Sequence, residues 1–310
     1  MTLPVADLLA AGLLQEAEWL IRRGASTPLS LNELAERLHT QLAPESFFVS
    51  PGYYAPLPNW AEAEHCCGVA YQASSVVERY RQQLQSKPSN LVGAYTIRQL
   101  AAMQHAWLQL GQPSQLRVLD FGGALGSHFH ALEPYWPWCR LLWTVCETTA
   151  VATAGTADFE CDRPNGTTLR FTDQASEVVN TGIDLVFASC SLQYLEHWPN
   201  MLQLFRAAPW LLLDRVPLID HPTDLIAIQV VPASYTDTRY PGWKFSASTW
   251  LPRLHAAGFE PALQWLVPED RWTILDLNTG KRRWSAQHDH GFLFRRRRVT
   301  DRPAADPVRF

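Results

Sequence analysis

The feature that most constrains this 310-residue chain is a glycine-rich turn that follows an apolar segment. Residues 117–121 read Arg-Val-Leu-Asp-Phe, and Gly122, Gly123 and Gly126 come next. The apolar run predicts a buried strand, and the glycines allow a tight turn in which backbone N–H groups approach a ligand closely. A helix is predicted to begin after the turn, so its first N–H groups face the same ligand. The alternative is that the glycines serve only close packing of the helix on the strand.

The next predicted strand, residues 141–147, ends in an acid, Glu147. A carboxylate there can accept hydrogen bonds from both hydroxyls of a ribose, as in dinucleotide-binding units. Asp120, which precedes the glycines, would repel a pyrophosphate but can accept from the ammonium of an amino acid. S-adenosylmethionine carries such a group and NAD does not, while the absence of a G-K-[ST] sequence argues against ATP. These residues favour S-adenosylmethionine as the ligand, with NAD as its main competitor.

After residue 115, short apolar segments alternate with helical ones. Strands are predicted over residues 116–121, 141–147, 168–171, 183–189, 209–215, 225–231, 262–267 and 290–295, and helices over 125–134, 198–207 and 246–257. The alternation predicts βαβ units and a mainly parallel sheet. No helix is predicted between the last two strands, so we expect them to form an antiparallel hairpin at the sheet edge.

The first 110 residues read as helical. Helices are predicted over 5–23, 30–38, 59–65, 70–86 and 93–110, with a loop over 42–58. We therefore expect a helical cap over residues 1–110, a ligand-binding domain over 111–296 and a flexible tail over 297–310. The cap leaves room for a homodimer contact. The basic run Arg295 to Arg298 is interpreted as a solvated end, and a contact with a phosphate or an acidic carrier protein is the alternative.

The composition restricts the classes of binding partner and the cellular compartment that we expect. A formal net charge of −4 argues against a nucleic-acid binder. We find no secretory leader and nothing near the roughly 18 uninterrupted apolar residues of a membrane span. The six cysteines form no C-x-x-C pair, which favours a reducing cytoplasm and no structural zinc. His128 and His130 stand two residues apart on a predicted helix and do not share a face, so we expect no metal. The expected partner is a small molecule.

Further segments follow in a characteristic order. They are the glycine turn, Glu147, Ser-Cys-Ser-Leu-Gln-Tyr-Leu at 189–195, Leu-Asp-Arg-Val-Pro at 213–217, Ile-Gln-Val-Val-Pro at 228–232, Tyr-Pro-Gly-Trp at 240–243 and Gly-Phe-Leu-Phe at 291–294. Over about residues 60–294 the chain resembles the class I S-adenosylmethionine-dependent methyltransferases. More narrowly, it resembles a methyltransferase family of bacterial polysaccharide and natural-product gene clusters. The resemblance implies a Rossmann-like class I methyltransferase fold, with a seven-stranded mostly parallel sheet, here carrying the N-terminal helical cap.

The resemblance also implies a set of site residues. Asp120, Gly122, Gly123 and Gly126 would hold the methionine and ribose part, Glu147 the ribose, Thr172 and Asp173 the adenine, and Ser189, Leu192, Gln193 and Tyr194 would lie beside the sulfonium. Our candidates on the substrate side are polar or aromatic residues near strand ends or in the cap, namely Arg215, Gln229, Tyr240, Trp243 and Tyr71. Arg215 is interpreted either as an ion-pair partner within the fold or as a fork for a substrate carboxylate or phosphate.

The chemistry expected from the resemblance is transfer of a methyl group to an oxygen or nitrogen of a small molecule. Tyr194 can face the sulfonium with its ring, and Glu196 or His197 can act as a general base. The alternative within enzymes is cyclisation, because the azetidine-2-carboxylate synthases look similar and turn S-adenosylmethionine itself into a four-membered-ring amino acid with release of methylthioadenosine. An alternative of another class is a non-catalytic, regulatory nucleotide-binding protein.

Overall fold

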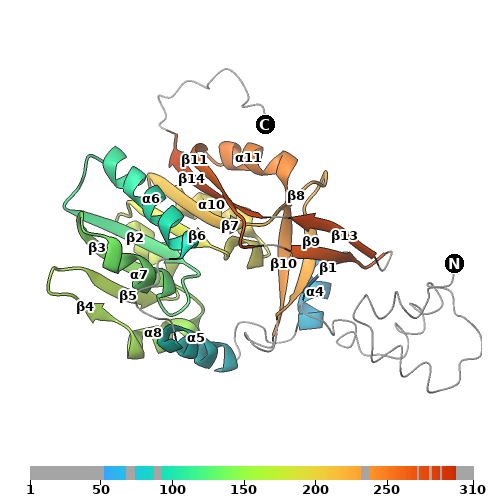
Figure 1. The fold of residues 1–310 in the computed structure, drawn as a ribbon, viewed down its shortest axis with the longest axis horizontal. Coiled ribbons are helices and arrows are strands. Elements are labelled where there is room, and N and C mark those ends of the chain that lie inside the picture. Colours follow the sequence, from blue (N-terminus) through green and yellow to red (C-terminus); the bar gives the residue numbers. More distant parts are fainter. Residues whose placement is uncertain are drawn as a thin grey trace, which may run out of the picture.

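The computed structural model describes residues 52–67, 74–86, 93–231, 238–270, 272–278, 281–286 and 288–297. Their elements form two β-sheets that lie next to each other along the long axis of the molecule (Figure 1). The helices predicted over 5–23 and 30–38 lie outside the described residues. No helix among the described residues is long and apolar enough to cross a bilayer.

The larger sheet has eight strands. Their order is β11 (Phe259–Val267), β14 (Asp289–Arg296), β7 (Trp210–Val216), β6 (Leu185–Ser189), β2 (Gln115–Phe121), β3 (Arg140–Cys146), β5 (Thr168–Thr172) and β4 (Cys161–Asp162). The five strands from β7 to β5 are parallel, while β14 runs antiparallel between β7 and β11 and the two-residue β4 is antiparallel to β5. This mostly parallel sheet confirms the predicted α/β fold class, with β4 added to the seven strands expected.

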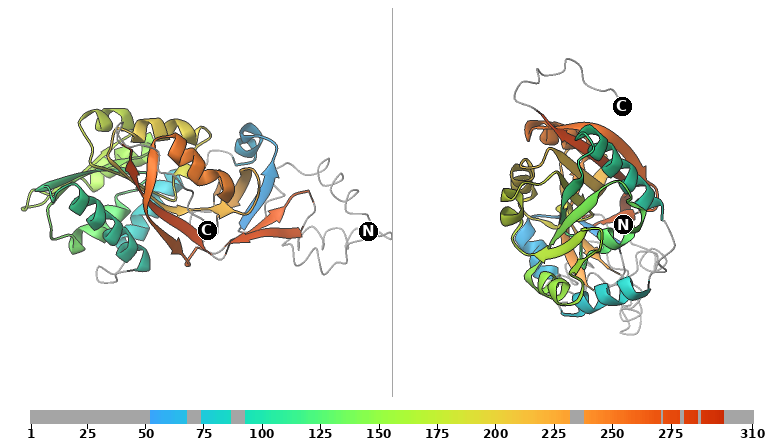
Figure 2. Two further views of the ribbon diagram at one scale, coloured as in Figure 1. Left: turned by 90° about the horizontal axis from the view of Figure 1, so that it is seen from above. Right: turned by 90° about the vertical axis from the view of Figure 1, so that its left-hand side faces the viewer.

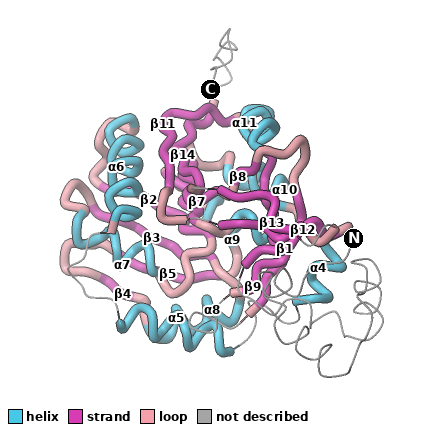
Figure 3. Tube along the Cα trace, turned by 45° about the vertical axis from the view of Figure 1, so that its right-hand side comes forward, coloured by secondary structure: helices cyan, strands magenta, loops and turns pink. Residues whose placement is uncertain are grey.

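Helices cover both faces of this sheet (Figures 2 and 3). One face packs against α9 (Ala175–Asn180), α10 (Trp198–Phe205) and α11 (Ala247–Ala256), and the other against α6 (Ala94–Gln109) and α7 (Ser127–Leu132). At the β5 edge, α8 (Thr149–Asp158) contacts β5 and α5 (Ser74–Ser86) packs on α8. Because both faces are covered, the central strands are mostly apolar, and β6 is buried at all five positions, which is why they could be recognised in the sequence.

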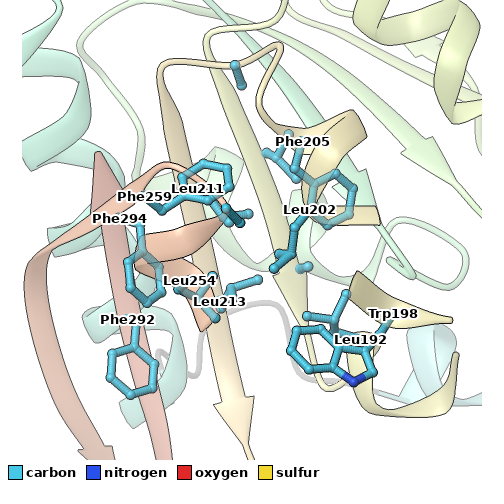
Figure 4. Close-up of a cluster of buried hydrophobic side chains, with 14 of the residues drawn as sticks. Leu192, Trp198, Leu202, Phe205, Leu211, Leu213, Leu254, Phe259, Phe292 and Phe294 are labelled. Atoms are coloured by element: carbon cyan, nitrogen blue, oxygen red, sulfur yellow. The ribbon is translucent and has the colours of Figure 1, made fainter. Parts of the chain in front are cut away.

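The core on the α10 and α11 face shows how the strands divide their side chains (Figure 4). Leu211 and Leu213 of β7 point to this face, whereas the intervening Leu212 packs in the cluster on the opposite face. Phe205 of α10 is fully buried in the cluster and stacks edge-on against Phe121 at the end of β2, with ring centroids 5.3 Å apart. The strand end that carries the glycine turn is therefore held by a packed core.

The second sheet was not predicted as a sheet. Its order is β13 (Lys281–Ala286), β12 (Trp272–Asp276), β1 (Gly52–Leu57), β9 (Leu225–Val230), β10 (Arg239–Ser246) and β8 (Leu218–Ile219). α4 (Trp60–Cys67) packs on β9 and β10, where Trp60 stacks on Trp243 with ring centroids 5.5 Å apart. This sheet joins chain segments as distant as β1 and β12, which pair in parallel.

The structure corrects three sequence-based expectations. The loop predicted over 42–58 contains strand β1, so the region before residue 110 is not all-helical. The strand predicted at 225–231 is present as β9 but belongs to the second sheet. The last two strands of the large sheet pair antiparallel as expected, yet β12 and β13 lie between them in sequence, and β14 rather than β11 is the inner strand. The helices predicted over 59–65, 70–86 and 93–110 are confirmed as α4, α5 and α6.

Candidate functional site

The glycine turn, residues 122–126, lies at the carboxyl end of β2, where the strand order reverses. The chain moves from β2 to β3 on one side and later returns to β6 on the other, and such reversal points are where α/β sheets bind ligands. Gly122 has a φ of 75°, and a Cβ there would lie 2.4 Å from Cβ of Ser191, in the loop after β6. A Cβ on Gly123 would lie 2.2 Å from Oδ2 of Asp120. Both positions therefore require glycine.

Asp120 supports the turn from beneath. Its side chain is fully buried, and Oδ2 accepts a hydrogen bond from Nε1 of Trp143 at 3.1 Å. Nδ1 of His128, on α7, lies 3.1 Å from Oδ1. The carboxylate predicted to meet an ammonium group thus faces the protein interior and holds β3 and α7 against the turn.

Glu147 joins the end of β3 to the same turn. Its Oε1 accepts a hydrogen bond from the N–H of Ala124 and its Oε2 from the N–H of Thr148, both at 3.0 Å. Burial raises the pKa of this carboxyl, and the two N–H donors oppose that shift. Each carboxylate oxygen has a second lone pair, so Glu147 retains acceptor capacity for two further donors.

Three buried hydroxyls beside the turn lack hydrogen-bond partners among the described residues. They belong to Ser189 at the end of β6, Ser191 in the next loop and Thr148 after β3. Buried polar groups in native proteins are nearly always satisfied, by protein, water or ligand. Three orphaned hydroxyls at two strand ends therefore indicate a polar molecule that fits this crevice.

Backbone strain marks the same edge of the sheet. The non-glycine residues Ala124, Cys190 and Arg215 have φ values of 52°, 52° and 57°, and they lie at the carboxyl ends of β2, β6 and β7. Such conformations cost about 1–3 kcal/mol each, and they gather at functional sites. Cys190 is held by its N–H, which donates to the carbonyl of Asp214 at 3.0 Å.

The residues predicted to contact adenine lie at the next strand end. Thr172 ends β5, and its carbonyl accepts from the N–H of Glu147 at 3.0 Å. Asp173 is exposed and accepts from the Thr149 hydroxyl at 2.7 Å and from Nε2 of Gln174 at 3.2 Å. These bonds lower the pKa of Asp173, with the Thr149 hydroxyl as the largest cause. Glu147, Thr172 and Asp173 therefore share one edge of the crevice.

A small pocket lies between the two sheets, with about 310 Å³ of space that includes its open mouth. We call it the inter-sheet pocket, and its lining residues are Tyr53, Cys190, Gln193, Tyr194, Pro217, Ala227, Gln229, Gly242, Trp243, Lys244 and Asp289. The loop after β6 serves both sites, because Ser191 faces the glycine turn while Cys190, Gln193 and Tyr194 line the pocket.

Four predicted residues meet in this pocket, namely Gln193, Tyr194, Gln229 and Trp243. The hydroxyl of Tyr194 donates to Oε1 of Gln229 at 2.5 Å, and Nε2 of Gln193 donates to Sγ of Cys190 at 3.2 Å. Nε1 of Trp243 donates to the carbonyl of Leu195 at 3.0 Å. These bonds connect the loop after β6 to β9 and β10, so the pocket wall is built across both sheets.

Arg215 is engaged within the protein. Its Nε lies 2.6 Å from Oδ2 of Asp270, and its guanidinium sits over the ring of Tyr95, 5.3 Å from the centroid. The charge of Cys190, followed by the bond to Asp270, raises the pKa of Arg215. The ion-pair interpretation is therefore confirmed, and Arg215 does not line the pocket.

The remaining predicted residues lie elsewhere. Glu196 and His197 are exposed and lie 3.6 Å apart, outside the pocket lining. Leu192 is buried in the core cluster, and Tyr240 is buried with its ring 5.9 Å from that of Tyr194. Tyr71 lies outside the described residues. The geometry thus brings Tyr194 to the pocket without the two bases expected beside it.

Sequence reasoning missed the charged residues of the pocket, Lys244 and Asp289. Lys244 lies on β10 and Asp289 begins β14, and both are buried. Burial lowers the pKa of Lys244 to about 8 and raises the pKa values of Asp289 and of Tyr53, on β1. A lysine within the otherwise apolar Tyr240–Phe245 segment was the available signal, because lysine is almost never buried without a reason.

No group of three or more His, Cys, Asp or Glu side chains among the described residues is arranged to hold a metal ion. We find no protein-family model that matches the chain and no curated protein that matches it in sequence.

Several solved structures resemble the chain at low identity. The 1,6-didemethyltoxoflavin-N1-methyltransferase of Burkholderia thailandensis is 17% identical, with 80% of this chain and 95% of that chain covered and a TM-score of 0.39. The magnesium protoporphyrin IX methyltransferase of Synechocystis PCC 6803 is 15% identical, with coverages of 73% and 93% and a TM-score of 0.41. The glycopeptide N-methyltransferase MtfA is 17% identical, with coverages of 63% and 86% and a TM-score of 0.38. Similarities this distant carry no inference about ligands.

Proposed function

We propose that this protein binds S-adenosylmethionine across the carboxyl ends of β2, β3 and β6 and transfers its methyl group to an oxygen or nitrogen of a small molecule in the inter-sheet pocket. The observation that carries this proposal is the glycine turn at the end of β2. Gly122 packs against Ser191 with no room for a side chain, and Glu147 is bonded to the turn and has acceptor capacity left over.

The residues present fit this cosubstrate. Glu147 would accept from the ribose hydroxyls, and Thr172 and Asp173 would lie along the adenine. The orphaned hydroxyls of Ser189 and Ser191 would meet the polar amino-acid end. Asp120 has a different role from the one predicted, because its buried carboxylate positions the turn instead of touching a ligand.

In methyl transfer, the main task of the protein is to position the acceptor and the cosubstrate. S-adenosylmethionine supplies a methyl carbon that its sulfonium already makes electrophilic, so the side chains must align the acceptor, exclude water and free a lone pair. Tyr194, anchored by Gln229, stands at the pocket wall in the loop that also touches the glycine turn. It would orient the acceptor toward the methyl group.

The inter-sheet pocket favours methyl transfer over self-cyclisation. Cyclisation needs one molecule, and a separate pocket beside the crevice is then without use, whereas methyl transfer needs space for an acceptor. Polysaccharide or secondary-metabolite biosynthesis, a cytoplasmic location and a homodimer formed through the cap stay predictions from the sequence.

One incubation tests the proposal. The purified protein receives S-adenosylmethionine alone or with a mixture of small phenols and amines, and the products are separated by mass spectrometry. We expect S-adenosylhomocysteine and a methylated acceptor only in the second reaction, and their loss in Glu147→Ala but not in the exposed Glu177→Ala control. Methylthioadenosine with a four-membered-ring amino acid from the first reaction would identify a cyclase. Binding without any product would favour the regulatory alternative.

A further inference from the structure

Lys244 occupies an unusual position in the inter-sheet pocket. Its side chain is 3% exposed, and Nζ lies 3.3 Å from the ring centroid of Tyr53 and 4.0 Å from that of Trp272. The two rings come from β1 and β12, so three strands of the second sheet enclose one amine. Aromatic faces attract a cation, but they do not neutralise its charge.

No carboxylate of the described residues lies within 4.0 Å of this amine, and none of their acceptors hydrogen-bonds to it. Asp289 accepts from Nε1 of Trp272 at 2.6 Å, and Asp270 is paired with Arg215, so both acids act on the amine only through space. Burying a charge without a partner is costly, so a lysine at such a position is either neutral or paired with something that enters the pocket.

The rest of the pocket defines what can enter. Tyr53, Tyr194 and Trp243 present aromatic surface, which suits a flat ring, and Gln193 and Gln229 present amide groups. The space of about 310 Å³ is mostly open solvent at the mouth, so the acidic group of a small ring would reach Lys244 while the rest of the ring stays at the mouth.

We propose that the inter-sheet pocket takes a small aromatic acceptor with an acidic O–H or N–H group, and that Lys244 receives this proton and pairs with the resulting anion. The inference rests on the proposed function, because the anion is then the nucleophile. The balance is simple: the O–H or N–H proton moves to the neutral amine, the lone pair left behind bonds to the methyl carbon, and the C–S electron pair remains on sulfur.

The groups around Lys244 determine the pH range in which its amine can receive a proton from the acceptor. Burial lowers its pKa to about 8, while the charges of Asp289, Cys190 and Asp270 oppose that shift. Tyr53 keeps its proton because burial raises its pKa, and Trp272 does not titrate. The amine therefore exists in both protonation states near neutral pH, as proton transfer to and from an acceptor requires.

The test uses 4-nitrophenol, which is yellow only as the phenolate, and it needs no S-adenosylmethionine. At about pH 6, where the free dye is mostly colourless, we expect binding to the native protein to produce the phenolate band. In Lys244→Met the affinity should fall at least tenfold and the bound dye should be colourless. At this pH the amine is already protonated, so the band reports pairing of the phenolate with a cation, and Lys244→Arg should keep it. Because a guanidinium cannot take up a proton, Lys244→Arg should nevertheless lose methyl transfer to a phenol. Arg140→Met, which replaces an exposed cation at the start of β3, is the matched control.

A second comparison does not depend on any variant folding. The dye's methyl ether, 4-nitroanisole, has the same ring and no acidic proton, so it should bind the native protein at least tenfold more weakly. Equal binding of dye and ether, equal bands in the native protein and Lys244→Met, or no binding of the dye would each overturn the proposal. If the dye behaves as expected but S-adenosylmethionine does not bind, the proposed function fails and an acid-binding pocket remains. If methyl transfer occurs while Lys244→Met binds the dye unchanged, this inference fails alone.

Discussion

The two sheets of this protein build their sites in different ways. In the proposed account, the large sheet would recognise its ligand with two glycines that exclude side chains, N–H groups held by Glu147 and short hydroxyls at strand ends. The second sheet contributes long side chains, with Lys244, Tyr53 and Gln229 turned into the pocket. Backbone geometry suits a ligand of fixed shape, whereas side chains are easily exchanged. The division therefore matches an unvarying cosubstrate on one sheet and a particular acceptor on the other.

The largest effect should come from the core that holds the glycine turn. Phe205→Ala removes a fully buried ring that contacts Phe121 and is expected to lower the free energy of unfolding by about 3–5 kcal/mol. Ile274→Val, in the small cluster of the second sheet, should cost only about 0.5–1.5 kcal/mol. Denaturant unfolding of both variants checks this. A loss for Phe205→Ala as small as that for Ile274→Val would show that this ring does not support the core beneath the glycine turn.

Gly122→Val should disrupt the proposed cosubstrate site. Its Cβ would collide with Ser191, and its φ of 75° disfavours any branched residue. We expect the affinity for S-adenosylhomocysteine to fall by about 100-fold, or roughly 2.8 kcal/mol, in titration calorimetry. Gly93→Ala, a glycine with open space and an ordinary backbone, serves as the control. An unchanged affinity for S-adenosylhomocysteine in Gly122→Val would contradict the placement of the cosubstrate at this turn.

Glu147→Ala should weaken the same binding by about 1.5–3 kcal/mol, since it removes a charged acceptor. The exposed Glu177→Ala variant should behave as the native protein does. Calorimetry measures both. Unchanged affinity in Glu147→Ala would show that Glu147 does not hold the ribose, even if the ligand bound elsewhere at this edge of the sheet.

The effect that is smallest per pH unit concerns the second sheet. The pKa of Lys244 is about 8 in the folded protein, below its ordinary value of 10.5, so between these pH values the unfolded chain binds more protons and stability rises with pH. Relative to Lys244→Met, the native protein should gain at most about 1.4 kcal/mol per pH unit in this window and nothing further below it. Unfolding curves at several pH values from 7 to 11 check the sign. A constant difference would show that Lys244 titrates normally.

The sequence predicted the large sheet well and the second sheet poorly, for a physical reason. Strands buried on both faces are continuous apolar runs, as in β6, where all five residues are buried. β1, with Gly52 and Pro56, has the composition of a loop and becomes a strand by pairing with β9 and β12. Long-range pairing of this kind leaves no periodic pattern in the sequence.

The site residues also divide into those that local sequence predicted and those that depend on long-range packing. The positions of Gly122, Gly123 and Glu147 followed from local spacing, because a turn between a strand and a helix is a local structure. The direction of the Asp120 carboxylate did not, since it depends on Trp143 and His128 packing beneath the turn. Lys244 could not be assigned to a pocket either, because its neighbours Tyr53 and Trp272 lie far away in the chain.

The most direct test of the central claim is a crystal structure of the protein with S-adenosylhomocysteine. We expect the ribose hydroxyls on the Glu147 carboxylate, the amino-acid end beside the glycine turn, and the sulfur facing the inter-sheet pocket. A nucleoside bound elsewhere, or a Glu147 carboxylate that still contacts only the N–H groups of Ala124 and Thr148, would contradict the account.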